Sequence, residues 1–229
     1  IAEANLGYGV ERPKAFIDAV VAIALTLLIL PLMDSLGDAA RSGDDTLTWL
    51  VGQRGQITSF LISFVLIMMF WMINLRLFSV VEMVTAPLLW LLAGWVLTIV
   101  WLPIATAITG RMADDDILAR VLNIGSLILT SLMSLALRLY VRNHPNLRTG
   151  GDPEVTNGAA IDISLVLLFT VALVLAVVFP VVGYYSLFVM LLSDPVQRIV
   201  RRLMPPTKDR IALALGLSTH RLKPVQVRQ

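Results

Sequence analysis

Five charge-free stretches, separated by charged segments of 7 to 25 residues, dominate the chain. They cover residues 19–33, 57–75, 83–110, 121–137 and 163–193. An apolar helix needs about 20 residues to cross the hydrocarbon core of a bilayer, which is about 30 Å thick. The pattern therefore predicts helices that span a membrane, and the last stretch is long enough to hold more than one.

A continuous helix over residues 163–193 would be roughly 45 Å long, at about 1.5 Å per residue. Pro180 removes a backbone hydrogen bond and Gly183 permits a tight reversal, so we expect two short spans there. One long tilted helix, and hence five spans in total, is the alternative. We predict six helices in a single domain over residues 1–229, near 13–33, 57–76, 83–108, 119–141, 161–179 and 181–193, followed by a basic tail over 194–229.

Composition supports a membrane protein. The chain is 57% hydrophobic and 15% charged, with a mean hydropathy of +0.82, which is too apolar for a soluble globular domain. It contains no cysteine, which excludes disulfides and thiolate metal sites. We therefore predict an all-α membrane protein.

Lysine and arginine are unequally divided between the two sides of the predicted bundle. Arg41, Arg54, Arg111 and Arg120 fall on one side, and the other fourteen of the 18 basic residues fall on the side that holds both termini. Lysine and arginine collect in cytoplasmic segments. The sequence thus predicts a multi-pass protein with both termini in the cytoplasm.

Motifs typical of soluble enzymes are missing from the sequence. His144 and His220 fall in polar segments. A solvated loop is a better interpretation of the three aspartates at 114–116 than a cation site, because adjacent side chains point in different directions. The basic tail lacks the interleaved aromatic residues of nucleic-acid sites, whereas it can contact the headgroups of membrane lipids. We expect no enzyme, no cofactor, no tightly bound metal and no nucleic-acid partner.

The first apolar helix carries a stripe of residues on one face. At about 100° per residue, Ile23, Thr26, Leu27 and Leu30 lie within about 60° of Ile23, while Asp18 lies about 140° away. By pattern alone this stripe is ordinary packing or lipid contact. A charge in a membrane helix needs a partner, so we expect Asp18 to pair with a cation or donor on the second helix, where Asn74 and Arg76 lie at the same depth.

Three predicted helices carry recognisable motifs. The first has Arg12, Phe16 and Asp18, followed by Ala22, Ile23, Thr26, Leu27, Leu30 and Pro31. The second has Ser63, Phe64, Phe70, Trp71, Arg76, Leu77 and Phe78, and the third ends with Leu102, Pro103 and Thr106. In spacing and order these motifs resemble the transmembrane protein 175 family, potassium channels of lysosomes and prokaryotes. The resemblance covers roughly the first half of the chain.

Two positions depart from the family's pattern. Ile17 stands where the family has serine, and Asn74 and Leu75 stand where it carries histidine after the tryptophan. Asparagine forms hydrogen bonds but carries no charge, so a cluster of Arg12, Asp18 and Asn74 would lack the titration that histidine adds.

The resemblance implies a fold and a function. Six-span prokaryotic members lie in the cell (inner) membrane and assemble as homotetramers whose first helices surround a pore. By position, Ile23, Thr26, Leu27 and Leu30 would line that pore as a hydrophobic gate selective for K⁺ but leaky to other monovalent cations. K⁺ would bind transiently near Thr26, unless this hydroxyl bonds its own helix instead. Arg12, Phe16, Asp18, Trp71, Asn74 and Arg76 would form a structural signature network.

Two other functions stay open. A cation- or proton-coupled secondary transporter could use Asp18 and Arg12 as a relay, although carriers place ionisable residues at mid-membrane on several helices. A non-conducting membrane scaffold is the third alternative. The charge-free cores of the second, third and fourth helices favour the channel.

Overall fold

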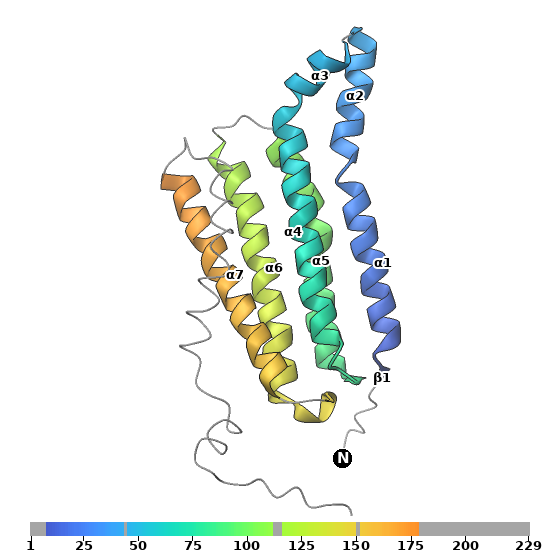
Figure 1. Cartoon of the computed structure of the whole chain (residues 1–229), viewed down its shortest axis with the longest axis vertical. Helices are drawn as coiled ribbons and strands as arrows, with labels where there is room; N and C mark the ends of the chain where they lie inside the picture. The colour runs from blue at the N-terminus through green and yellow to red at the C-terminus, as the bar shows by residue number, and fades with distance from the viewer. Residues whose placement is uncertain (1–7, 44, 112–115, 150–151, 179–229) are drawn as a thin grey trace, which may run out of the picture.

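The computed structural model describes residues 8–43, 45–111, 116–149 and 152–178. Within them the protein is a bundle of long helices, with one short antiparallel ribbon at one end (Figure 1). The helices are α1 (Glu11–Leu27), α2 (Leu30–Ser42), α3 (Thr46–Gly52), α4 (Arg54–Phe78), α5 (Ala86–Arg111), α6 (Ile117–Asn143), the 3-10 helix η1 (Pro145–Leu147) and α7 (Asp152–Val178).

Five segments of the described chain are long and apolar enough to cross a membrane: α1 together with α2, then α4, α5, α6 and the part of α7 from Gly158. They correspond to the first five predicted helices, so the all-helical membrane class is confirmed. The predicted sixth span (181–193), the break at Pro180 and Gly183, and the basic tail (194–229) lie outside the described residues.

The first span is longer than predicted. α1 and α2 together cover 32 residues, or about 48 Å, which exceeds the hydrocarbon core. α2 therefore extends past the membrane. There its Asp34 forms an exposed ion pair with Arg111 of α5, at 2.6 Å. Where the sequence suggested only a polar connection, Asp45 caps the additional helix α3 by accepting a hydrogen bond from the Thr48 N–H.

Other boundaries moved because of local hydrogen bonds. α5 begins at Ala86, not at 83, because Met83–Val84 (β2) pairs with Tyr8–Gly9 (β1) as an antiparallel ribbon. α6 begins at Ile117 because the Asp116 carboxylate accepts hydrogen bonds from the N–H groups of Leu118 and Ala119. α7 begins at Asp152, nine residues before the predicted start at 161.

The core lies between α4, α5, α6 and α7, and large side chains fill it. Phe70 of α4 packs against Phe169 of α7, with ring centroids 6.2 Å apart, and both are fully buried. At the ribbon end, the segment between α4 and α5 is bonded on its other side to the chain after α6, through Glu82 N–H to the Leu147 carbonyl and Thr149 N–H to the Val80 carbonyl. This end of the bundle is thus fixed by main-chain bonds, and α1 packs along one edge of the assembly, against α4 and α5 (Figure 1).

Candidate functional site

One side of α1 carries a continuous apolar stripe that the rest of the described chain does not cover. Ile23, Leu27 and Leu30 are 58%, 39% and 52% exposed. The opposite side of the same helix packs into the bundle through Ile17, Val21, Ala24 and Leu28, all buried. The stripe picked out from the sequence therefore lies on the outward face, where it is free to meet lipid, another chain or an aqueous path.

Thr26 lies in this stripe and its hydroxyl is engaged with its own helix. The Oγ1 atom donates to the Ile23 carbonyl at 2.7 Å, which is the backbone bond that the sequence left open as an alternative to ion coordination. Donation uses the single hydroxyl proton and leaves the oxygen lone pairs available. The hydroxyl can therefore still accept a hydrogen bond or contact a cation.

The helix is interrupted within the stripe, after Ile23, Thr26 and Leu27 and before Leu30. α1 ends at Leu27 and α2 starts at Leu30, with Ile29 N–H bonded to the Thr26 carbonyl at 3.3 Å in a tightened turn. Pro31 causes this break, because it has no N–H to offer the carbonyl four residues earlier, that of Leu27. The predicted pore residues therefore straddle a helix break, with Leu30 beyond it.

Asp18 is held by the second long helix, as expected, but by a different residue. Its Oδ1 accepts a hydrogen bond from the indole Nε1 of Trp71 on α4 at 2.8 Å. Asn74 is buried beside it, and both line a small cavity with Trp71. Arg76 lies near the end of α4 with its side chain exposed, so tryptophan rather than arginine supplies the donor.

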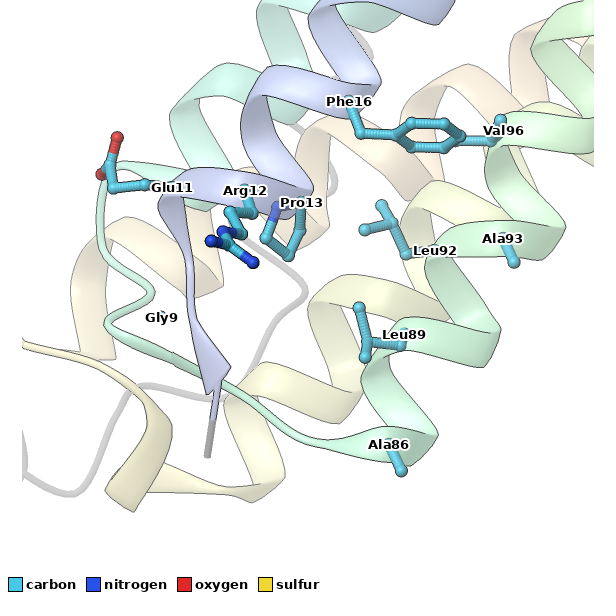
Figure 2. A pocket seen from close by; sticks show the side chains of 10 residues that line it. All are labelled: Gly9, Glu11, Arg12, Pro13, Phe16, Ala86, Leu89, Leu92, Ala93 and Val96. Carbon is cyan, nitrogen blue, oxygen red and sulfur yellow. The ribbon is translucent and has the colours of Figure 1, made fainter. Parts of the chain in front are cut away.

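Arg12 does not join this cluster, contrary to the sequence-based expectation. It lines a groove between α1 and α5, and Figure 2 shows its guanidinium directed into that space while Glu11 points away. Helix geometry explains the separation. Asp18 follows Arg12 by six residues and so lies about 120° around the helix. Phe16, 61% exposed, extends across the same groove toward Val96 (Figure 2).

The structure therefore divides the predicted signature residues into two groups. Asp18, Trp71 and Asn74 meet at the α1–α4 contact, whereas Arg12 and Phe16 face the α1–α5 groove. Arg12 and Asp18 are not close partners, so the structure offers no direct relay between them.

An ion pair that the sequence analysis missed lies inside the bundle. Arg138 of α6 donates through Nε to Asp162 of α7 at 2.6 Å, and their side chains are 5% and 0% exposed. The same guanidinium reaches the Ile73 carbonyl of α4 at 3.5 Å. Both residues flank charge-free stretches, so the sequence alone predicts that they lie at helix ends. The signal available was Gly158, where any side chain would overlap with the guanidinium.

Indole groups make further links between helices. Trp95 donates to the Ser134 hydroxyl at 2.8 Å and Trp101 to the Ser126 hydroxyl at 3.1 Å, both from α5 to α6. Buried Arg120 of α6 donates to the Ala176 carbonyl of α7 at 2.9 Å. Polar contacts thus hold α6 against both of its neighbours, and among the described residues no cluster of acidic, His or Cys side chains could hold a metal ion.

One known family matches the first part of the chain. The family model described as the endosomal/lysosomal potassium channel TMEM175 matches residues 12–103. The match covers 92 of the 229 residues and agrees with the resemblance that the sequence motifs carry. A comparison with curated proteins gives no match to the chain.

The match to this family of potassium channels supports the resemblance and an ion-channel function. Together with the five apolar helices long enough to cross a membrane, the match supports a multi-pass membrane protein. The matched TMEM175 segment contains α1, its break, α4 and most of α5. It therefore includes the stripe and the Asp18–Trp71 bond, whereas the Arg138–Asp162 pair lies beyond it.

Proposed function

We propose that the chain forms a homotetrameric channel in the cell (inner) membrane that conducts K⁺ and, less readily, other monovalent cations. The carrying observation is the uncovered apolar stripe on α1, inside the segment that matches a potassium-channel family. A closed rotational assembly brings one such stripe from each chain to a common axis. Both termini lie in the cytoplasm, lipids surround the assembly, and no cofactor is required.

The gate consists of apolar rings. Ile23 and Leu30 present no ligand atoms, so a narrow pore at these positions loses its water and blocks ions, whereas a wider pore passes partly hydrated ions. K⁺ gives up water more easily than Na⁺, which favours K⁺ at such a constriction. Leu27 contributes to the same rings from the edge of the stripe.

Thr26 provides the polar contact next to these rings. Because its proton is engaged by the Ile23 carbonyl, its oxygen presents lone pairs, the arrangement that a transient K⁺ contact requires. The break at Leu28 and Ile29 lets the helix change direction at the gate. A bend at this break would move the Leu30 side chains outward and widen the pore there, while the Ile23 ring and the packed side of α1 stay in place.

Flux measurements test this proposal. Purified protein in liposomes is assayed for K⁺, Na⁺ and H⁺ flux, comparing wild type with Ile23→Asn, Thr26→Ala and the control Leu132→Asn, which alters an exposed apolar residue on α6. We expect Ile23→Asn to raise K⁺ flux because an amide keeps the constriction wet, Thr26→Ala to lower the preference for K⁺ over Na⁺, and the control to match wild type.

The opposite results are equally clear. If neither α1 substitution changes cation flux, the stripe does not line a pore. If flux saturates and requires a counter-gradient, the protein is a secondary transporter. The mass of the detergent-solubilised protein is a second test, because a monomer removes the basis for a central pore.

A further inference from the structure

The groove between α1 and α5 begins at one end of the bundle and runs along α5 (Figure 2). It has a volume of about 800 Å³, which lies within the range of small-molecule sites. Its walls are mostly apolar, and they include Pro13 and Phe16 of α1 and Leu89, Leu92, Ala93 and Val96 of α5.

The charge in this groove is at its outer end. Arg12 lies in the first turn of α1, directs its guanidinium into the groove, and has no hydrogen bond or ion pair with any described residue, while the neighbouring Glu11 carboxylate points away (Figure 2). A cation at the mouth and apolar walls below match a ligand with an anionic head and a hydrocarbon chain.

The length of the groove fits one leaflet. From Ala86 to Val96 the wall of α5 extends about 15 Å along its axis, which is half of a hydrocarbon core of about 30 Å. The mouth lies at the ribbon end of the bundle, where Lys14 of α1, Arg76 in the last turn of α4 and Arg142 in the last turn of α6 also lie. Anionic lipids are drawn to such a basic membrane surface.

We propose that this groove binds an anionic phospholipid, with the phosphate on Arg12 and one acyl chain lying between α1 and α5. A guanidinium donates paired hydrogen bonds to phosphate oxygens, which a lysine in the same place would not reproduce. Arg12 and Phe16 lie within about 20° of Ile23 around the helix, at about 100° per residue, so the groove flanks the stripe on α1. The inference therefore requires that the groove stays open to lipid beside the stripe.

Native mass spectrometry of the full chain in detergent tests the site. Phosphatidylglycerol and phosphatidylcholine with identical acyl chains are titrated into wild type, Arg12→Gln and Ala93→Trp, with Arg142→Gln and Val100→Trp as controls for an exposed charge and an exposed apolar position outside the groove. We expect wild type to prefer phosphatidylglycerol, and Arg12→Gln to weaken it about fivefold, the effect of one basic residue near the surface.

A variant that fills the groove distinguishes binding of the acyl chain from binding of the lipid headgroup. Ala93 is exposed, so Ala93→Trp adds bulk in the groove and should weaken both lipids, with Ala93→Leu as a smaller filling if the first variant does not fold. Neither control should change affinity. Equal binding of the two lipids by wild type, or equal loss in Arg142→Gln and Arg12→Gln, would overturn the proposal. So would a changed oligomeric mass in Ala93→Trp with lipid binding intact, since the groove would then hold a second copy of the chain.

Discussion

Removing one charge of the Arg138–Asp162 pair should destabilise the bundle strongly. The two side chains are 5% and 0% exposed and meet at 2.6 Å, so Asp162→Asn leaves the guanidinium buried without a counter-charge. Breaking a buried pair from one side costs about 3–5 kcal/mol. The amide oxygen of asparagine can still accept one hydrogen bond, so we expect about 3 kcal/mol, at the lower end of that range.

An exposed ion pair of the same length is the matched control. Arg111 and Asp34 also meet at 2.6 Å, but their side chains are 51% and 67% exposed, so Asp34→Asn should cost at most about 1 kcal/mol. The assay is unfolding of the detergent-solubilised protein by increasing SDS in mixed micelles, followed by tryptophan fluorescence and circular dichroism. The difference in unfolding free energy between the two variants measures the effect of burying the pair, because both pairs have the same length.

Replacing both partners provides the deciding comparison. Arg138→Met with Asp162→Leu removes both charges, so this double variant should be more stable than Asp162→Asn alone. The reasoning fails if the double variant is the less stable of the two, or if Asp162→Asn and Asp34→Asn cost the same. Either result would mean that water or another group compensates the buried guanidinium.

The remaining predictions concern α1, α3 and α4. Trp71→Phe removes the indole donor to Asp18 and should cost about 1–3 kcal/mol in the same unfolding assay, whereas Trp90→Phe, at a side chain 80% exposed, should cost less than about 0.5 kcal/mol. Pro31→Ala restores the missing N–H, so hydrogen exchange should slow at the α1–α2 break; unchanged exchange there would exclude proline as its cause. The hydrogen bonds that Asp45 accepts in the first turn of α3 hold its pKa below the ordinary 3.8, so the cap stabilises α3 above that pH and is lost as pH falls through the lower folded value. NMR of the α3 amides between about pH 6 and pH 2 should therefore show the helix loosening only at the acidic end, and loosening near neutral pH would contradict the assignment.

Much of the candidate site follows from helix periodicity. A stripe at positions 23, 26, 27 and 30 has to share a face in any α-helix, and that face is uncovered in the structure. The separation of Arg12 from Asp18 follows from the same geometry, since six residues turn the helix well away from its starting direction. Periodicity does not predict which residue of α4 contacts Asp18. The choice between Trp71, Asn74 and Arg76 depends on how α1 and α4 lie against each other.

The sequence by itself determined the membrane class and the first five spans, because bilayer thickness fixes how many apolar residues a span needs. Its motifs also indicated the segment that matches the TMEM175 model. It also indicated the helix break, since proline acts within its own helix. Only the tertiary structure decided which charges lie inside the bundle. Arg138 and Asp162 stand 24 residues apart on two helices, and Gly158 leaves the room on α7 that the Arg138 guanidinium occupies. Such a contact depends on packing between elements, which no local pattern of hydrophobic and polar residues records.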